Sequence, residues 1–275
     1  PFLLLSTLNE MKNENCDLFF AGDIVYPLAS AAYGDQNAQQ QCLDKHLPGA
    51  KLSLRAEVPC DKLKEDTCSG FTFIDEGNKR IGLVFRRPSK TAARSDRTSM
   101  PHLKQWVDYD IGYISNLNST IDFQVWGEGG LGDDIVRLSS AHPDYALYIT
   151  GHSLGGSMSA LAAVRVAKNG IHPNQNIIFY NFGEPRTGDK KFANLLDSLV
   201  QGYRVVHDKD IIPHTPFPFM GYHHHQTEVF YENDMTLGSP YVVCQGQEDP
   251  NCSARYQSDL NLLHDHFHYF NINVV

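Results

Sequence analysis

The chain has 275 residues, of which 41% are hydrophobic and 20% are charged. This length suits one large domain or two small ones around a sizeable core, and no run approaches the roughly 20 apolar residues that span a membrane. The formal net charge is −9 and the basic residues are scattered, which argues against nucleic acid or an anionic membrane as the main partner.

Strands and helices alternate along much of the chain. Apolar side chains recur every three or four residues from Leu154 to Val166, as in a helix, and the run NIIFYNF is typical of a strand covered on both faces. In chain order the predicted elements are a strand at 81–85, a strand at 143–150, a helix over 153–168, a strand at 176–182, a helix over about 190–199 and a strand at 203–207. This alternation predicts an α/β fold with a mainly parallel sheet and right-handed crossovers.

The stretch from 86 to 118 is harder to assign. RRPSKTAARSDRTSM is polar and typical of a loop. The apolar residues that follow recur roughly at helical spacing, and they are Leu103, Trp106, Val107 and Ile111. Such a stripe is either plain core or part of a movable cover, because a cover needs an apolar inner side. The glycine-rich WGEGGLGDD at 126–134 lacks the context of a phosphate-binding loop, so no nucleotide site is expected there.

Two features of the chain bear on its compartment. The N-terminal PFLLLSTLNE has too short an apolar run, and no basic flank, for a signal peptide. A secreted protein would therefore have this sequence as its processed chain. Asn118 and Asn251 each begin an Asn-X-Ser/Thr triplet, which fits the secretory route and makes both candidate glycosylation sites. We expect a secreted protein.

The six cysteines predict disulfides of a secreted protein. Two pairs bracket seven residues each, and such short loops make them the simplest pairings. The expected disulfides are Cys60–Cys68, Cys244–Cys252 and, from the two cysteines left over, Cys16–Cys42. A structural zinc site needs tighter C-x2-4-C pairs, which the sequence lacks.

A predicted strand leads into GHSLG at 151–155, and a predicted helix follows. This order matches the G-x-S-x-G turn, whose central serine takes strained backbone angles, so that the residues two away must be small. Ser153 is therefore a candidate nucleophile. The backbone N–H of Leu154, free at the helix start, is a candidate donor to an oxyanion. His152 lies at a variable position of the turn, and we expect a structural role for it.

A serine nucleophile needs a histidine base, and the histidine needs a carboxylate. Asp208 and Asp210 follow the strand at 203–207. The C-terminal LLHDHFHYF offers three histidines, which are His264, His266 and His268. Every combination satisfies the order Ser, Asp, His of the α/β-hydrolases, so position alone leaves the choice open.

Several blocks resemble the class 3 lipases, most closely their extracellular yeast branch. ITGHSLGGSMSALAA is similar to the elbow and its helix, NFGEPRTGD to the F-G-x-P-R-x-G segment, and GYHHHQTEVFY to a block after the acid. In RVVHDKDIIPHTPF the resemblance selects Asp210, which directly precedes the apolar pair and proline, and in DHFHYF it selects His266. VVCQGQEDPNC resembles a disulfide loop of the yeast branch and supports the Cys244–Cys252 pair. The resemblance runs from about 143 to 270, and before that it rests mainly on IGLVFRR.

The resemblance implies one α/β-hydrolase domain over 1–275, with a possible lid within 90–115 that contains the apolar stripe. It implies a serine hydrolase of carboxylic esters, above all triacylglycerols, that forms an acyl-enzyme on Ser153. His266 would be the base and Asp210 its partner. No metal or organic cofactor is needed, no obligate protein partner is implied, and the expected partner is an ester lipid at an interface. The alternatives are a carboxylesterase, a phospholipase A1 or a feruloyl esterase on the same fold, or a weakly active or non-catalytic lipid-binding homologue.

One departure from the family concerns the second oxyanion donor. At the end of the strand that corresponds to 81–85 here, the family usually has F-R-G-T or F-R-G-S. In this chain Arg87, Pro88 and Ser89 follow Phe85-Arg86. Without a gap Pro88 takes the donor position, and proline has no N–H. Either Ser89 donates from a loop one residue longer, or this half of the oxyanion hole is impaired.

The run His223-His224-His225 invites a metal interpretation. Neighbouring residues of a strand point to opposite faces, so three in a row do not converge on one ion without an unusual turn. We therefore expect structural hydrogen bonding from one of these histidines and no metal site.

Overall fold

The computed structural model describes residues 20–59, 67–86, 106–108, 113–115, 123–256 and 263–274. An eight-stranded sheet crosses this part of the chain in the order β1-β2-β3-β6-β7-β8-β9-β10. Its strands are β1 Lys51–Pro59, β2 Thr67–Asp75, β3 Arg80–Arg86, β6 Ala146–His152, β7 Ile177–Phe182, β8 Gly202–His207, β9 Glu228–Tyr231 and β10 Val242–Val243. Neighbouring strands from β3 to β9 pair in parallel, and β1, β2 and β10 are antiparallel to their neighbours.

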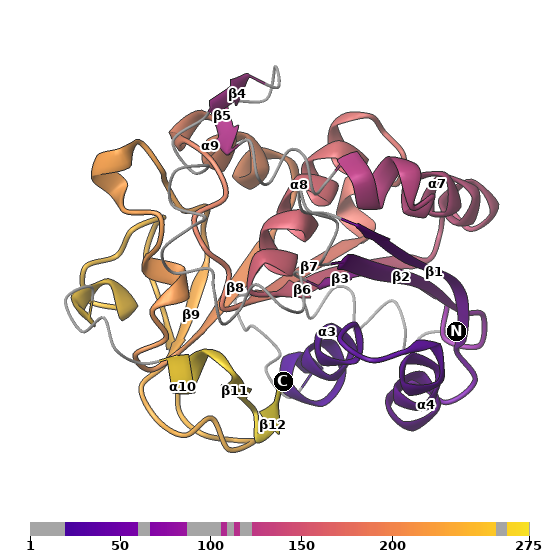
Figure 1. Cartoon of the computed structure of the whole chain (residues 1–275), viewed down its shortest axis with the longest axis horizontal. Helices are drawn as coiled ribbons and strands as arrows, with labels where there is room; N and C mark the ends of the chain where they lie inside the picture. The colour runs from indigo at the N-terminus through magenta and orange to yellow at the C-terminus, as the bar shows by residue number, and fades with distance from the viewer. Residues whose placement is uncertain are drawn as a thin grey trace.

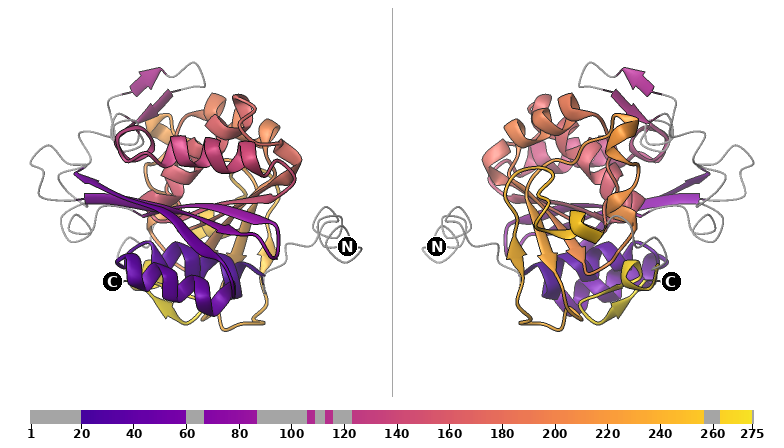
Figure 2. Two further views of the ribbon diagram at one scale, coloured as in Figure 1. Left: turned by 90° about the vertical axis from the view of Figure 1, so that its right-hand side faces the viewer. Right: turned by 90° about the vertical axis from the view of Figure 1, so that its left-hand side faces the viewer.

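Helices cover both faces of the sheet, as Figures 1 and 2 show. One face carries α7 Leu131–Ala141, α8 Leu154–Lys168 and α9 Lys190–Leu199. The other carries α3 Tyr26–Ala31, α4 Gln36–His46 and the C-terminal elements α10 Leu263–His266, β11 His268–Tyr269 and β12 Ile272–Asn273. Short helical turns complete the described part, and they are η1 Ala21–Val25, η4 Phe123–Glu128, η5 Asn174–Asn176, η6 Ile212–His214, η7 Pro218–Met220 and η8 Ser253–Tyr256. Among the described residues no helix combines the length and the apolar character needed to cross a bilayer.

The two covered faces explain the apolar character of the central strands. In β6, Leu147 and Ile149 pack into the core beneath α8, whereas Ala146 and Tyr148 pack into the core beneath α3 and α4. A strand alternates its side chains between two faces, so a strand buried on both faces must be apolar throughout. This burial accounts for the uninterrupted apolar runs in the sequence, and the predicted α/β fold with a mainly parallel sheet is confirmed.

Most helices and strands predicted from the periodicity of apolar residues lie close to their predicted positions. The helix α9 has the predicted bounds, α8 begins one residue after the predicted helix, and β6 begins three residues after the predicted strand. The stripe around Trp106 and Val107 is different, because Trp106–Asp108 (β4) and Tyr113–Ser115 (β5) form an antiparallel hairpin beside α9 (Figure 1). The helical spacing inferred for Trp106 and Val107 was wrong, because the spacing of a few apolar residues in a short window does not distinguish a helix from a hairpin.

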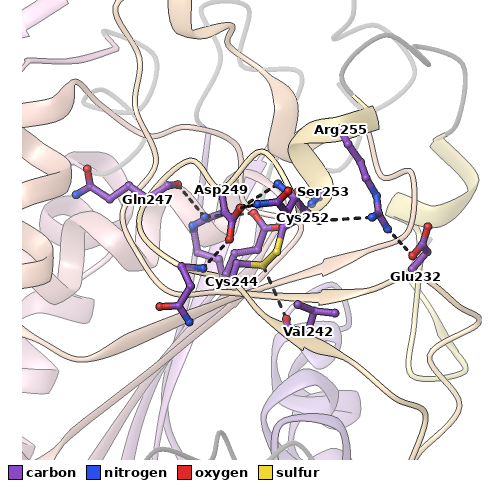
Figure 3. The surroundings of a disulfide bond; sticks show 12 residues. Glu232, Val242, Cys244, Gln247, Asp249, Cys252, Ser253 and Arg255 are labelled. Carbon is purple, nitrogen blue, oxygen red and sulfur yellow. Dashed lines mark hydrogen bonds and ion pairs between the residues drawn. A yellow bond between two sulfur atoms is a disulfide. The ribbon is translucent and has the colours of Figure 1, made fainter.

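The disulfide predictions have three outcomes. Cys244 and Cys252 are joined, with Cα atoms 6.2 Å apart, so this pair is confirmed (Figure 3). Cys68 is also disulfide-bonded, and its expected partner Cys60 lies outside the described residues. The Cys16–Cys42 prediction is wrong, because Cys42 has a free thiol.

Cys42 lies on α4, where its half-buried side chain packs against the core beneath the sheet. Its sulfur lies 3.4 Å from the carbonyl oxygen of Pro27, to which the thiol donates. Burial raises the pKa of the Cys42 thiol to about 11, so the reactive thiolate is scarce at neutral pH. A cysteine that remains after the other cysteines have been paired therefore need not form a disulfide.

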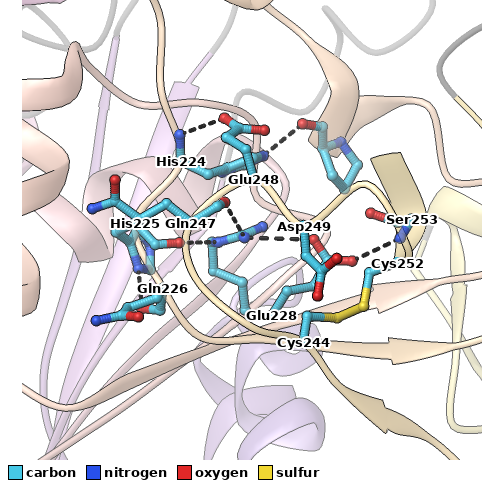
Figure 4. A network of polar contacts seen from close by, with 12 residues as sticks. His224, His225, Gln226, Glu228, Cys244, Gln247, Glu248, Asp249, Cys252 and Ser253 are labelled. Carbon is cyan, nitrogen blue, oxygen red and sulfur yellow. Dashed lines mark hydrogen bonds and ion pairs between the residues drawn. A yellow bond between two sulfur atoms is a disulfide. The ribbon is translucent and has the colours of Figure 1, made fainter. Parts of the chain in front are cut away.

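The disulfide loop carries Glu248 to a buried arginine. The Arg186 guanidinium donates from Nε and Nη2 to the two carboxylate oxygens of Glu248, at 2.8 Å each. Its Nη1 donates to the carbonyl oxygens of His214 and Pro216, at 2.7 and 3.0 Å. Glu248 also accepts the backbone N–H of His224 (Figure 4). The Arg186 guanidinium therefore joins the disulfide loop to the segment that follows β8.

We predict that Glu248→Gln weakens the fold mainly at neutral pH. Burial opposes ionisation of Glu248, but Arg186 and the hydrogen bonds outweigh it and lower the pKa of this carboxyl. A carboxyl with a lowered folded pKa stabilises above its unfolded pKa, and the stabilisation is lost as the pH falls through the folded value. Urea unfolding at pH 7 should show a loss of about 1–3 kcal/mol that shrinks below about pH 4.

The matched control is Glu232→Gln. Glu232 pairs with Arg255 as Glu248 pairs with Arg186, but both partners are exposed (Figure 3). Exposed pairs contribute little, so this variant should unfold like the parent. A loss for Glu248→Gln that stays constant from pH 7 to pH 3 would show that the charge of Glu248 is not what stabilises.

Candidate active site

Ser153 occupies a sharp turn between β6 and α8. Its backbone angles are φ 59° and ψ −132°, which L-residues other than glycine rarely adopt. Hydrogen bonds hold the turn from both sides, since the Ser153 N–H donates to the Phe182 carbonyl at 2.9 Å and the Gly156 N–H donates to the Ser153 carbonyl at 2.8 Å. The strain therefore persists because the surrounding backbone determines it.

Two glycines make this turn possible. A Cβ on Gly151 would lie 2.2 Å from the carbonyl oxygen of Gly155. A Cβ on Gly155 would lie 2.4 Å from the carbonyl oxygen of Phe85, at the end of β3. Both contacts are with backbone, which cannot move aside as a side chain can. The spacing G-x-S-x-G is thus a packing requirement of this chain, as the sequence predicted.

Three side chains from distant parts of the chain form one hydrogen-bonded series. Ser153 Oγ lies 2.8 Å from His266 Nε2, and His266 Nδ1 lies 3.0 and 2.9 Å from the two carboxylate oxygens of Asp210. All three residues are buried. Because Nδ1 faces a carboxylate, the proton of a neutral His266 belongs on Nδ1, which leaves Nε2 as the acceptor of the serine proton.

The Asp210 carboxylate is fully buried and fully bound. It accepts the Tyr269 hydroxyl at 2.6 Å and the Ile212 N–H at 2.9 Å, besides His266. Burial opposes its ionisation, but His266 and these donors outweigh burial and lower the pKa of Asp210. The carboxylate therefore stays charged although it is buried. Nothing in the sequence signalled this role for Tyr269 beyond its place in DHFHYF.

The competing candidates lie elsewhere. Asp208 has its backbone at φ 35°, and burial together with the nearby Asp265 raises the pKa of its carboxyl. His264 has an 80% exposed side chain, and His268 bonds to Asn273. Of the candidates left open by chain order, the geometry brings together Asp210 and His266.

A second histidine braces the short helix that carries His266. His207, at the end of β8, places Nδ1 3.1 Å from the Asp265 carbonyl oxygen and Nε2 2.9 Å from the Asn233 carbonyl oxygen. Its backbone N–H donates to the Tyr269 hydroxyl at 3.3 Å. Sequence reasoning missed this role, although a histidine that ends an apolar strand was a signal for a polar task.

Half of the expected oxyanion site lies in the described part of the chain. Leu154 is the first residue of α8, where a backbone N–H has no acceptor within the helix and the helix dipole favours negative charge. Arg87, Pro88 and Ser89 lie outside the described residues. The Arg86 side chain is directed toward β2 and β1, since it donates to the Thr67 carbonyl at 2.6 Å and pairs with Glu57.

Of the other predicted site residues, Leu103, Ile111 and Asn118 lie outside the described residues. Trp106 and Val107 belong to β4. Asn251 is exposed, and its side-chain amide donates to Asp249 at 3.1 Å. Its candidacy for glycosylation stays a prediction.

The histidine run makes separate hydrogen bonds. His224 Nε2 donates to the Pro213 carbonyl at 2.7 Å, and His225 Nε2 lies 2.8 Å from Glu184. Burial and two nearby arginines hold the pKa of His224 well below its ordinary value. Within the described ranges the group with metal-ligand spacing is Glu228, Cys244 and Cys252, and its two sulfurs are already joined (Figure 4).

Gly183 packs directly against the Asp210–His266 pair. It has φ +56°, and an added Cβ would lie 2.8 Å from Asp210 Oδ2 and 3.0 Å from His266 Nδ1. We predict that Gly183→Ala lowers kcat for a p-nitrophenyl ester by about 10²-fold, because displacements near 1 Å have this effect. The matched control is Gly170→Ala, at φ +63° with open space around it.

Both alanines bear the same backbone strain, about 1–2 kcal/mol, and only the first meets the triad. Thermal unfolding should therefore show a cost for both variants, and kcat should separate them. Equal kcat values for the two variants would show that Gly183 serves the backbone alone.

The comparisons with known proteins agree with this geometry. A family model for class 3 lipases matches residues 93–220. A lipase of Caenorhabditis elegans is 30% identical over 248 residues, which are 79% of this chain and 69% of that protein. A lipase of Rhizopus niveus is 33% identical over 225 residues, 77% of this chain and 53% of its own length, so this chain spans about half of that relative.

Solved structures of lipases share the fold. The lipase of Rhizopus microsporus var. chinensis superposes with a TM-score of 0.76 at 26% identity, over 98% of this chain and 88% of the other. The lipase of Yarrowia lipolytica superposes with a TM-score of 0.70 at 25% identity, over 94% of each chain, which mildly supports the expected closeness to the yeast branch. With its α/β-hydrolase fold and these relatives, the chain belongs to the class 3 lipase family.

Proposed function

We propose that this protein is a serine hydrolase of carboxylic esters that acts as a triacylglycerol lipase. The hydrogen-bonded series from Ser153 through His266 to Asp210, on a strained elbow, carries the proposal. A serine hydroxyl is a weak nucleophile by itself, and a base within 2.8 Å removes that limitation. The names of the relatives, which are lipases, point to the same reaction.

The geometry supports a two-step mechanism. Ser153 Oγ attacks the ester carbonyl carbon while its proton passes to His266 Nε2. The resulting imidazolium gives that proton to the departing alcohol as the ester C–O bond breaks, which leaves an acyl-enzyme. Water then attacks the acyl carbon, His266 takes a proton from it, and the acid leaves as Ser153 regains its proton. Asp210 holds the tautomer and stabilises the imidazolium throughout.

The developing oxyanion needs donors in fixed positions. The Leu154 N–H, at the start of α8, is one of them in our proposal, and the helix dipole assists it. We assign the second to Ser89, which has an N–H and a hydroxyl where Pro88 has no N–H. A lid within 90–115, an acylglycerol substrate at a lipid interface and a secreted location belong to the same proposal.

Two other candidate functions differ from this proposal, one in its substrate and the other in having no catalysis. A carboxylesterase, phospholipase A1 or feruloyl esterase would use the same triad on other esters. A non-catalytic lipid-binding homologue is favoured by one observation, the Arg87-Pro88 departure at the usual donor position. Activity measurements therefore have to separate substrate class from the presence of catalysis.

We predict hydrolysis of emulsified tributyrin and of p-nitrophenyl esters, with a higher rate on the emulsion than on its monomers. Ser153→Ala should lower kcat by at least about 10⁴-fold, and His266→Ala by a similar factor. The double variant should lose no more than either single variant, because the members of a triad act as a unit. Full activity of Ser153→Ala would reject the mechanism, and a preference for phospholipid or feruloyl esters would reject the substrate.

We predict that Ser89→Ala lowers kcat on a short-chain ester by up to about 10²-fold, since an oxyanion donor contributes that much. Pro88→Thr, the comparison variant, should not help if Ser89 already donates. If Pro88→Thr raises kcat strongly and Ser89→Ala has no effect, the natural oxyanion hole is incomplete, and a weakly active homologue becomes the better description.

A further inference from the structure

His152, the residue before the candidate nucleophile, contacts the candidate base. It is fully buried at the end of β6. Its Nε2 lies 2.8 Å from the backbone carbonyl oxygen of His266, and its Nδ1 lies 3.1 Å from the hydroxyl of Tyr33. The imidazole rings of His152 and His266 are stacked, with centroids 4.6 Å apart and planes 29° apart. One side chain thus touches both the backbone and the ring of His266.

The partners of His152 bear on where its protons lie. A carbonyl oxygen only accepts, so the nitrogen that faces it, Nε2, must carry a proton. The Tyr33 hydroxyl donates or accepts, so it can donate to an unprotonated Nδ1. The neutral Nε2–H tautomer therefore satisfies both contacts. Tyr33 lies in the turn between α3 and α4, so a distant part of the chain supplies the second contact.

The neutral state suits the reaction. His266 becomes an imidazolium after it takes the serine proton, and a second positive charge at 4.6 Å would oppose that step. A neutral ring stacked on it offers contact without repulsion. The helix that carries His266, α10, has only four residues, so the backbone there depends on outside contacts for its position.

We propose that the His266 carbonyl and the Tyr33 hydroxyl together hold His152 as the neutral Nε2–H tautomer, and that His152 is a positioning residue that fixes the backbone and ring of His266 relative to Ser153. Because His152 and Ser153 are adjacent, the turn that places the nucleophile also places the base. The inference rests on the proposed function of the triad, and its first test does not depend on catalysis.

The first test is nitrogen NMR of the folded protein labelled at the histidine nitrogens, with the His152 signals assigned by their loss in His152→Gln. The proposal requires an unprotonated Nδ1 and a protonated Nε2 at neutral pH. A charged His152, or a proton on Nδ1, would overturn the proposal whatever the activity shows.

The second test is kinetic, on a soluble p-nitrophenyl ester. His152→Phe keeps a flat ring but loses the bond to the His266 carbonyl, and it should lower kcat about 10–100-fold with KM nearly unchanged, as misplacement of a catalytic group does. His152→Gln places an amide N–H near the former Nε2, and it should recover most of that loss. Tyr33→Phe should fall between the two, since it removes the hydroxyl that faces Nδ1 and keeps the bond from Nε2 to the His266 carbonyl.

The matched control is His172→Phe. His172 is also buried, and its Nε2 donates to a backbone carbonyl, that of Tyr145, at 2.8 Å. Both Phe variants should lower the melting temperature, and only His152→Phe should lower kcat. If the two variants keep equal kcat, His152 is merely structural. If Ser153→Ala keeps its activity, the proposed mechanism fails instead, and the NMR result still decides the state of His152.

Discussion

The close approach of β6, α8 and β3 around Ser153 is the constraint on which the site depends. A Cβ at Gly151 or Gly155 would overlap backbone oxygen atoms, so the chain turns there only with glycine at both positions. The same turn directs the N-terminus of α8 toward the negative charge that would develop beside Ser153 in the proposed reaction. Gly183 brings the end of β7 equally close to Asp210 and His266. Three glycines, which have no side chain, therefore define the space in which the three side chains of the triad meet.

Buried charges hold the segments that leave the sheet at this edge. Asp210 is fully buried and accepts from His266, Tyr269 and Ile212. Arg186 is also buried. Its guanidinium donates to two carbonyl oxygens of the segment after β8 and to Glu248 on the disulfide loop. A buried charge that loses its partner costs several kcal/mol. The disulfide loop thus has an electrostatic task as well as a covalent one.

Much of this fold could be predicted from local pattern, because strands covered on both faces and an amphipathic helix have distinct periodicities. The elbow at Ser153 was also readable, since strand, glycine spacing and helix occur in one stretch. The choice of Asp210 over Asp208 was not readable from position, because it depends on contacts with His266 and Tyr269 from residues more than 50 positions away. The resemblance to the class 3 lipases supplied that choice.

The errors have physical causes of the same kind. Pairing Cys42 by elimination ignored that a lone thiol packs well against a core, and this half-buried thiol donates to the carbonyl oxygen of Pro27. The apolar residues Trp106 and Val107 lie in a hairpin because a window so short fits two periodicities. His152 was expected to be structural, and no single-residue signal in GHSLG shows that its ring meets His266. Contacts across 114 positions of sequence carry no local pattern.

The charge states of the histidines around the site complete the electrostatic account. Burial, together with Arg186 and Arg204, lowers the pKa of His214 and holds that of His224 well below its ordinary value. The neutral form of both rings is therefore favoured at neutral pH. The positive charge that forms on His266 during the proposed reaction then has Asp210 as its directly bonded counter-charge, and the low pKa values of His214 and His224 disfavour a competing charge on either ring. Asp210 therefore favours the imidazolium at the residue that has to carry it.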